Sequence, residues 1–195
     1  MKKLILASTS SYRRALMKAA GFEAECVAPT YEERPIEGMD AMALIAHHAM
    51  GKAHSVADRY PDDIVIGSDQ GLIFDGRLLG KPGSAERAWE QLSMLRGNKA
   101  ILATGLTVIC GEVVRSHMNL ARLTFRNDLS DAAIRRYVAA DEPLDCAGSF
   151  KIESRGIRLF SSVECDDPSA IQGLPMMCLT RWINEFEPLW NEIFL

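Results

Sequence analysis

The sequence predicts an α/β fold in which helices flank a mixed, twisted sheet. In the first half of the 195-residue chain, short β-branched runs alternate with stretches of helical periodicity, which is typical of strands joined by crossover helices. In the second half, two long β segments at 100–110 and 113–125 follow each other around Gly111-Glu112, which predicts a hairpin. Together the two patterns favour a mixed sheet over a purely doubly wound one.

The first strand is joined to the first helix by a polar turn. Residues 3–7 form a short, largely apolar run, which predicts a buried strand. The triplet Ser8-Thr9-Ser10 follows this run and leads into a helical stretch over residues 12–20, which Gly21 ends. The chain is therefore expected to open as strand, polar turn and helix.

The next part of the chain predicts a strand, a loop and a long helix. A strand over residues 22–28 precedes segment 29–35, whose two prolines break all periodicity. From Asp40, a suitable N-cap, apolar residues recur at helical spacing to about Tyr60. This is the longest helix expected before the C-terminal region.

The middle of the chain predicts two short strands and a helix. The β-branched run at 63–67 indicates a buried strand that ends in the polar triplet Ser68-Asp69-Gln70. A following strand is expected over residues 71–74. Ser84 then caps a helix that extends to about Leu95.

Beyond the hairpin, the expected elements are a helix, a polar segment, a strand and a final helix. They cover, in this order, residues 129–140, 146–158, 159–163 and the chain from Pro175 to its end. No repeat or linker interrupts the chain, and 195 residues are enough to bury a core. We therefore expect a single domain over residues 1–195, or two intimate lobes.

Composition excludes several classes of protein. A net charge of −4 argues against proteins that bind a nucleic-acid backbone through a broad basic surface. The apolar run near the N-terminus is too short for a signal peptide or a membrane span, and no later segment suits a span. The five cysteines are odd in number and lack Cys-x-x-Cys spacing. We therefore expect a cytoplasmic protein without structural zinc, and no nucleic-acid or membrane partner.

The start of the first helix is a candidate phosphate site. Ser8, Ser10, Arg13 and Arg14 place hydroxyl and guanidinium groups beside unpaired backbone N–H groups, where the helix dipole also favours negative charge. The same residues fit an ordinary N-cap serine with two solvated arginines equally well. No Walker loop or Gly-x-Gly-x-x-Gly motif decides between the two interpretations.

Asp69 is the first candidate for a catalytic carboxylate. An aspartate at the end of a buried strand is costly unless it binds a metal, a proton or a partner, so Asp69 could be a general base. Glu32 and Glu33 could share a divalent cation with it, because Mg²⁺ prefers oxygen ligands. The alternatives are an aspartate that caps a turn before Gly71 and two solvated glutamates.

Two lysines are candidates for neutralising a polyphosphate. Lys52 lies on the long helix, and Lys81 lies in a Gly-Lys-Pro loop with restricted backbone freedom. Taken singly, each could equally be an ordinary surface lysine without a role in binding. The four histidines have no zinc-binding spacing.

An ordered series of short motifs resembles the Maf family of nucleotide pyrophosphatases over almost the whole chain. The motifs are Leu6-Ala7-Ser8-Thr9-Ser10-Ser11-Tyr12-Arg13-Arg14, Glu32-Glu33, Lys52-Ala53, Gly67-Ser68-Asp69-Gln70, Gly80-Lys81-Pro82, Cys146-Ala147-Gly148-Ser149-Phe150-Lys151 and Gly173-Leu174-Pro175. The resemblance implies a fold of the Maf/ITPase type, with two lobes around a central cleft, and a homodimer. The sequence departs from the family pattern at Gly51, where an acidic residue is usual, and at Ser11-Tyr12.

The resemblance also implies roles for the candidate residues. Asp69 would accept a proton, and Glu33 would be a partner of a metal or water. The groups around the triphosphate would be Ser8, Arg13, Lys52 and Lys81. A water activated by Asp69 and by Mg²⁺ or Mn²⁺, held by Glu33 and Asp69, would attack the α-phosphorus and release pyrophosphate.

Within the family, Ser68-Asp69-Gln70 and Gly148-Ser149-Phe150-Lys151 resemble the branch that hydrolyses 7-methyl-GTP, with Arg13, Gln70 and Glu153 as the residues that would select the substrate. The carboxylate of Glu153 can accept from the N1–H and amino groups of guanine, and N7-methylation adds a positive charge that it favours. The alternatives are a dTTP/UTP or broader pyrophosphatase and a non-catalytic, nucleotide-binding regulator of cell division.

Overall fold

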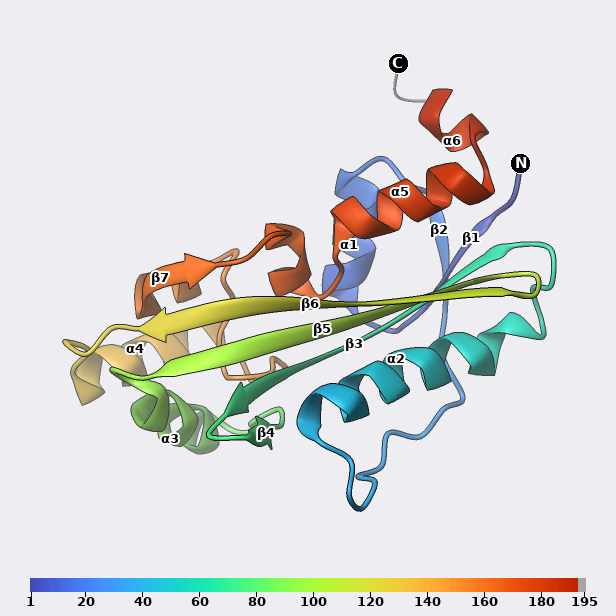
Figure 1. Cartoon of the computed structure of the whole chain (residues 1–195). Coiled ribbons are helices and arrows are strands. Elements are labelled where there is room, and N and C mark those ends of the chain that lie inside the picture. The colour runs from blue at the N-terminus through green and yellow to red at the C-terminus, as the bar shows by residue number, and fades with distance from the viewer. Residues whose placement is uncertain (193–195) are drawn as a thin grey trace. The chain divides into compact units, whose positions relative to one another are not determined.

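The computed structural model describes residues 1–192 and confirms the predicted α/β class (Figure 1). The strands are β1 Leu4–Ala7, β2 Ala24–Val27, β3 Ile64–Phe74, β4 Arg77–Leu79, β5 Lys99–Cys110, β6 Val113–Phe125 and β7 Phe160–Glu164. The helices are α1 Ser11–Ala19, α2 Ala41–Ala57, α3 Ala85–Leu95, α4 Asp131–Asp141, α5 Met176–Phe186 and α6 Leu189–Glu192, with short 3-10 helices η1 Arg155–Leu159 and η2 Pro168–Gln172.

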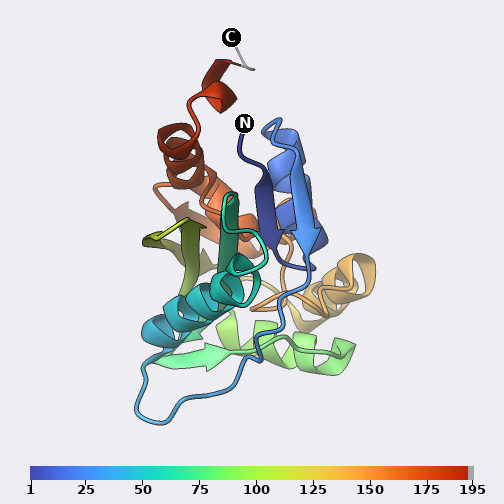
Figure 2. The ribbon, with the colours of Figure 1, turned by 90° about the vertical axis from the view of Figure 1, so that its right-hand side faces the viewer.

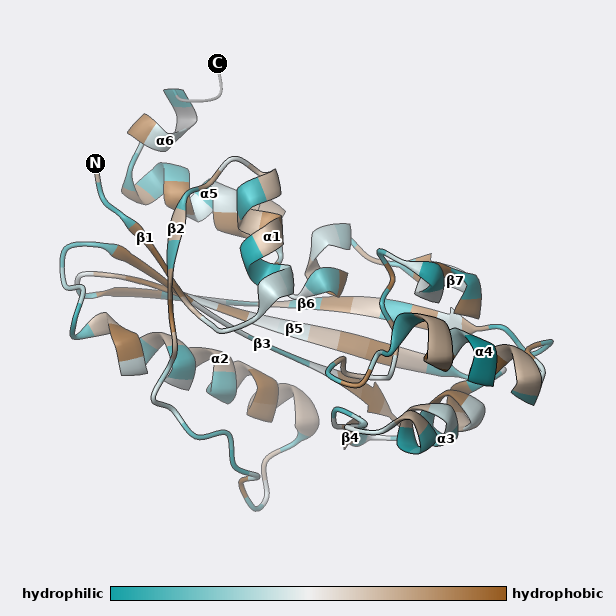
Figure 3. Ribbon diagram, turned by 180° about the vertical axis from the view of Figure 1, so that it is seen from behind, coloured by the Kyte–Doolittle hydropathy of each residue, from teal (hydrophilic) through white to brown (hydrophobic). Residues whose placement is uncertain are grey.

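The strands form a mixed sheet, as the sequence predicts. Their order is β2-β1-β3-β5-β6-β7, and β4 pairs with β3 outside this path. β1 pairs in parallel with β2 and with β3, whereas the β3–β4 and β6–β7 pairs are antiparallel. Figure 2 shows β1 and β2 side by side, and Figure 3 shows hydrophobic residues along the strands.

The chain divides into two compact units, and neither is continuous along the sequence. Unit 1 contains Met1–Asp69, Thr104–Asn119 and the chain from Asp167 onward, and unit 2 contains Gln70–Ala103 and Leu120–Asp166. The division passes through β3 between Asp69 and Gln70. The predicted site residues Ser8, Ser10, Arg13, Glu33, Lys52 and Asp69 therefore belong to unit 1, and Gln70, Lys81 and Glu153 belong to unit 2.

Unit 1 has a core on both faces of its strands. Because successive side chains of a strand point to opposite faces, Leu4 and Leu6 of β1 join one cluster, with Met17 of α1, while Ile5 and Ala7 join the other. The first cluster also contains α5 residues, and the second contains residues of α2. Burial on both faces explains why the strand appears in the sequence as one continuous apolar run.

Unit 2 packs around three phenylalanine rings. The ring centroid of Phe160 lies 4.7 Å from that of Phe125 and 5.0 Å from that of Phe150. On the helices of this unit, the guanidinium of Arg135 in α4 lies 4.1 Å from the ring centroid of Trp89 in α3. Both units therefore have aromatic or aliphatic cores of their own.

Two expected elements differ from the structure. The two strands expected over residues 63–67 and 71–74 are one strand, β3 (Ile64–Phe74), so the triplet Ser68-Asp69-Gln70 lies within a strand and not at its end. The sequence suggested an interruption because a charged residue is unfavourable in a buried strand, but an ion pair compensates Asp69 here. The final helix is interrupted between α5 and α6 at Pro188, which lacks the N–H that a helix needs. The expected end of that helix, residues 193–195, lies outside the described residues.

Among residues 1–192, no helix is long and apolar enough to cross a membrane.

Candidate functional site

A glycine brings helix α2 close to strand β3. A Cβ at Gly67 would lie 2.4 Å from the carbonyl oxygen of Ala49 and 2.6 Å from the backbone nitrogen of Ala53. Both distances are far below van der Waals contact, so any side chain at this position would push the helix away. Lys52 lies in the same turn of α2, and its side chain is buried at this contact.

Lys52 bridges two of the predicted carboxylates. Its Nζ lies 2.7 Å from Oδ1 of Asp69 and 2.7 Å from Oε1 of Glu33. The side chains of Lys52 and Asp69 are 9% and 11% exposed, whereas that of Glu33 is 53% exposed. One ammonium group therefore faces two carboxylates, so the triad contains one more acidic group than basic groups.

The two carboxylates fit the divalent cation that the sequence predicts. Carboxylate oxygens are the ligands that Mg²⁺ prefers, and Mg²⁺ commonly keeps water and phosphate oxygens for its other positions. Within the described part of the chain, no group of three or more His, Cys, Asp or Glu residues could hold a metal. Glu33 and Asp69 would therefore have to share such a cation with water and a phosphate-bearing ligand. Glu32, which the sequence also proposed as a ligand, pairs with Arg34 at the surface.

The polar turn after β1 is held together by Ser8. Its Oγ accepts hydrogen bonds from the backbone N–H of Ser10 at 3.1 Å and from Nη1 of Arg13 at 3.3 Å. Ser10 is the N-cap of α1, because its hydroxyl accepts from the backbone N–H of Arg13. The structure thus places Ser8, Ser10 and Arg13 together, with Ser10 in the capping role that the sequence left as an alternative.

Arg13 lies in the electrostatic field of the same carboxylates. Burial lowers the pKa of Arg13, and the negative charges of Asp69 and Glu33 act in the opposite direction. A guanidinium stays protonated at neutral pH even when its pKa is lowered. Unit 1 therefore gathers two cations, Arg13 and Lys52, and two carboxylates around the start of α1 and the middle of β3.

Gly173 anchors Arg13 and Ser68 holds Gly173, but neither residue was assigned a role from the sequence. The carbonyl oxygen of Gly173 accepts from Nε of Arg13 at 2.9 Å and from Oγ of Ser68 at 2.8 Å. Ser68 is fully buried on β3 next to Asp69. The motifs contain both residues, but no periodicity in the sequence indicates that residue 173 returns to residue 13.

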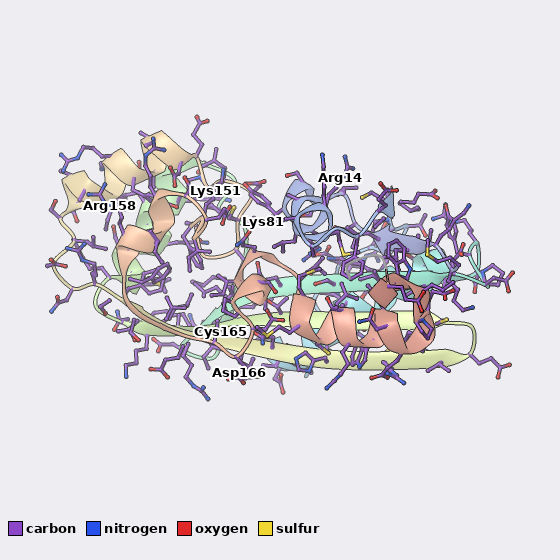
Figure 4. All side chains as sticks on the ribbon, turned by 90° about the horizontal axis from the view of Figure 1, so that it is seen from above. Arg14, Lys81, Lys151, Arg158, Cys165 and Asp166 are labelled. Atoms are coloured by element: carbon purple, nitrogen blue, oxygen red, sulfur yellow. The ribbon has the colours of Figure 1, made fainter. Side chains whose placement is uncertain are left out.

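The remaining predicted residues lie within unit 2. Gln70 is half-buried on β3, directly after Asp69. Lys81 is exposed on the loop before α3, and Glu153 is exposed before η1 (Figure 4 labels Lys81). The structure thus brings Ser8, Arg13, Glu33, Lys52 and Asp69 together in unit 1. The other three predicted residues, Gln70, Lys81 and Glu153, belong to unit 2.

Asp141 holds the segment that follows Glu153. Its Oδ2 accepts from the backbone N–H of Arg155 at 3.0 Å, and its Oδ1 accepts from Nη1 of Arg155 at 2.8 Å. Burial raises the pKa of Asp141, but hydrogen bonds from Arg155 and Ser154 outweigh this effect and hold the pKa below its ordinary value.

We expect Asp141→Asn to lower the free energy of unfolding by about 1 to 3 kcal/mol at pH 7, since a charge-assisted hydrogen bond is lost. A lowered pKa stabilises the fold above the ordinary value of 3.8, and this contribution disappears as the pH falls through the lower folded value. The difference between wild type and variant in urea unfolding should therefore shrink below pH 3.8. A difference that is constant from pH 7 to pH 3 would contradict this explanation.

Tyr31 fastens the loop that carries Glu33 onto α2. A Cβ at Gly51 would lie 2.3 Å from Cε2 of Tyr31, so the tyrosine ring occupies the space of a side chain at that position. The hydroxyl of Tyr31 is hydrogen-bonded to Nδ1 of buried His48 at 2.9 Å. Gly51 is one of the positions that depart from the family pattern. Its lack of a side chain leaves space for the ring of Tyr31, which precedes Glu33 by two residues.

We expect Gly51→Ala to displace Tyr31, move Glu33 away from Lys52 and reduce catalytic activity about tenfold, because small misplacements at a site have effects of this size or more. Stability should change by less than about 1 kcal/mol, because the gain in helix propensity offsets the clash. Steady-state kinetics and urea unfolding measure both. As a control, Gly51→Ala should stabilise a Tyr31→Ala background, where no ring is displaced; destabilisation there would exclude the clash as the cause.

Comparison with known proteins supports the resemblance seen in the motifs. The family model described as "Maf: Maf-like protein" matches residues 3–186. The chain is 44% identical to the 7-methyl-GTP pyrophosphatase of Albidiferax ferrireducens over 93% of this chain and 92% of that one. It is 41% identical to the 7-methyl-GTP pyrophosphatase of Cupriavidus pinatubonensis, over 95% of this chain and 94% of that one.

Among solved structures, the Ham1 protein of Staphylococcus aureus is 15% identical, with a TM-score of 0.48 over 81% of this chain and 93% of that one. A similarity this low supports no inference. The family match, in contrast, spans both units and all the candidate site residues. The chain therefore belongs to the Maf family of Maf-like proteins.

Proposed function

We propose that this protein is a nucleotide pyrophosphatase that hydrolyses 7-methyl-GTP to 7-methyl-GMP and diphosphate and so removes a modified nucleotide. The observation that carries the proposal is the buried Lys52, which holds Glu33 and Asp69 together beside Arg13. Relatives at 41 to 44% identity over most of the chain are named 7-methyl-GTP pyrophosphatases.

Asp69 is the proposed general base. Lys52 donates to its Oδ1, which leaves Oδ2 to accept a proton from the attacking water. The water oxygen forms a bond to the α-phosphorus, its proton passes to Asp69, and the bond between the α-phosphorus and the bridging oxygen breaks. Pyrophosphate leaves with the electron pair of that bond, so no covalent intermediate is needed.

The cations of unit 1 suit the charge that develops on phosphate. Lys52 and Arg13 are fixed before the substrate arrives, by Asp69 and by the carbonyl oxygen of Gly173, respectively. Groups that are already oriented stabilise a transition state without reorganisation. Lys81, on its exposed loop, is proposed as a third cation for the triphosphate.

Glu33 and Asp69 are proposed to hold a divalent cation, Mg²⁺ or Mn²⁺. Such an ion would neutralise phosphate oxygens and lower the pKa of the attacking water. Lys52 restrains both carboxylates, so their side chains would not need to become ordered when the ion binds.

Glu153 is the proposed determinant of the base. Its exposed carboxylate can accept from the N1–H and amino groups of guanine, and the positive charge of an N7-methylated ring favours a carboxylate over an amide. Glu153→Gln should therefore reduce the preference for 7-methyl-GTP over GTP, with Gln70 and Arg13 as further candidates for substrate contacts.

The test is pyrophosphate release from 7-methyl-GTP, GTP, UTP and dTTP with Mg²⁺, with Mn²⁺ and after chelation. Selective cleavage of 7-methyl-GTP that requires a divalent cation supports the proposal. Faster cleavage of UTP or dTTP would make that nucleotide the substrate in place of 7-methyl-GTP. If none of the four nucleotides releases pyrophosphate, the enzymatic function is overturned in favour of a nucleotide-binding regulator.

We also propose that the protein works as a cytoplasmic homodimer without nucleic-acid partners. None of the five cysteines forms a disulfide within the described chain, which fits a reducing compartment, and the net charge of −4 does not favour nucleic acid. The dimer follows from the family resemblance. Light scattering coupled to size exclusion gives the mass that decides it.

A further inference from the structure

Gln91 of α3 connects two loops that are about seventy residues apart in the sequence. Its Nε2 donates to the carbonyl oxygen of Gly80 at 3.0 Å, and its Oε1 accepts from Oγ of Ser149 at 2.5 Å. Gly80 begins the Lys81 loop (residues 80–83), and Ser149 lies in the Ser149 segment (residues 148–153), which ends at Glu153. All these groups belong to unit 2.

The chemistry of the amide fixes this bridge in one orientation. The carbonyl oxygen of Gly80 can only accept, so it requires the NH₂ group of Gln91. The hydroxyl of Ser149 can donate, so it suits the remaining oxygen. Turning the amide by 180° would place two oxygens against each other at Gly80. A glutamine fits both partners at once, whereas a glutamate or a methionine cannot.

Ser149 has an unusual conformation that needs such support. Its φ is +61°, in the left-handed region that residues other than glycine seldom adopt, and its side chain is completely buried. Residues held in this region persist only where the surroundings fix them. The hydrogen bond to Gln91 is one such restraint, and the backbone N–H of Lys151, two residues later, is held by the hydroxyl of Tyr137 at 2.9 Å.

We propose that Gln91 is a positioning residue that holds the Lys81 loop and the Ser149 segment at a fixed separation. This inference rests on the proposed function, in which Lys81 serves the triphosphate and Glu153 serves the base of one nucleotide. A nucleotide has a set distance between these two parts. The bridge keeps their two protein partners ready for it without Gln91 contacting the substrate.

A second contact limits how far the two loops could separate without Gln91. The backbone N–H of Gly83 donates to the carbonyl oxygen of Leu144 at 3.0 Å, four residues before Gly148. Loss of Gln91 should therefore make the two loops more mobile around Gly80 and Ser149, where Gln91 binds them, without unfolding unit 2. This makes variants at position 91 suitable for kinetic measurement.

We expect Gln91→Met to lower kcat/KM for 7-methyl-GTP about tenfold, chiefly through KM, because two hydrogen bonds that order binding groups are lost. The preference for 7-methyl-GTP over GTP should fall as well. Ser149→Ala, which removes only one of the two bonds, should have a smaller effect. The double variant Gln91→Met/Ser149→Ala should have a kcat/KM within about twofold of that of Gln91→Met, because the two groups act as a unit.

Ser93→Ala is the matched control on the same helix. The Ser93 hydroxyl is buried and, among the described residues, makes no hydrogen bond, so this variant leaves both loops as they are. It should keep the wild-type KM and substrate preference. If Gln91→Met also keeps them, or lowers only kcat while leaving KM unchanged, the proposal is overturned.

Amide hydrogen exchange tests the bridge without any substrate. In Gln91→Met, the backbone amides of Gly80, Lys81 and residues 148–150 should exchange at least about fivefold faster than in wild type. Helix α4 and the amide of Gly83, which stays bonded to Leu144, should remain protected. Unchanged exchange in both loops would overturn the positioning role even if the enzyme is active. If wild type cleaves no nucleotide but the exchange result holds, the proposed function fails and the bridge stands.

Discussion

Asp69→Asn is expected to lower kcat for pyrophosphate release by about a hundredfold to ten-thousandfold, which is the range that a general base contributes. Asparagine has nearly the same shape but does not accept the proton of the attacking water. Lys52 keeps its 2.7 Å contact with Glu33, so its charge is not left unpaired. The free energy of unfolding should therefore fall by only about 1 kcal/mol.

Asp128→Asn is a suitable control for this variant. Asp128 pairs with Arg126 at the surface, and surface pairs contribute little to stability. It should keep wild-type turnover within about twofold, with stability within about 0.5 kcal/mol. Turnover of Asp69→Asn within tenfold of wild type would exclude Asp69 as the base, provided that circular dichroism shows both variants folded.

Lys52→Met is expected to have the largest combined effect on activity and stability. It leaves Asp69, whose side chain is 11% exposed, without its cation and next to a second carboxylate. Breaking a buried ion pair by removing one partner costs about 3 to 5 kcal/mol. We expect the lower end of that range, because the charge of Arg13 also acts on Asp69. The value of kcat should fall at least about a hundredfold, as oriented cations at reacting phosphate do much of the catalysis.

The double variant Lys52→Met/Asp69→Asn separates the two effects. Removing both charges eliminates the unpaired buried carboxylate, so the double variant should regain more than about 1 kcal/mol of stability relative to Lys52→Met. Its activity should stay lost. Lys99→Met, at an exposed position, is the control for losing a lysine as such. A double variant less stable than Lys52→Met would show that the lysine stabilises by packing and not by charge.

The sequence predicted the elements of the fold because their signals are local. The N-caps Asp40, Ser84 and the start of α1 were identifiable from residue type and spacing, and all three lie at or within one residue of the observed helix starts. The hairpin of β5 and β6 was placed to within one residue. The interruption expected at Ser68-Asp69-Gln70 was wrong, since its charge is compensated by a lysine from another element.

The candidate site was only partly accessible in this way. Motif resemblance selected Glu33, Lys52 and Asp69, and the structure shows that the three form an ion-paired group. It gave no role to Tyr31 or Gly173, because their roles depend on contacts with residues 17 and 160 positions away in the chain, respectively. The catalytic roles of Glu33, Lys52 and Asp69 stay predictions until the variants are measured.

By itself, the sequence determined the α/β class, the mixed sheet and the family, because periodicity, capping residues and ordered motifs are properties of chain segments. Only the tertiary structure decided that Gly67 admits α2 to β3, that Lys52 is shared by two carboxylates and that Gln91 joins two loops. These contacts depend on distances across packed elements, which no local pattern encodes. The chemistry proposed for this protein rests on those distances.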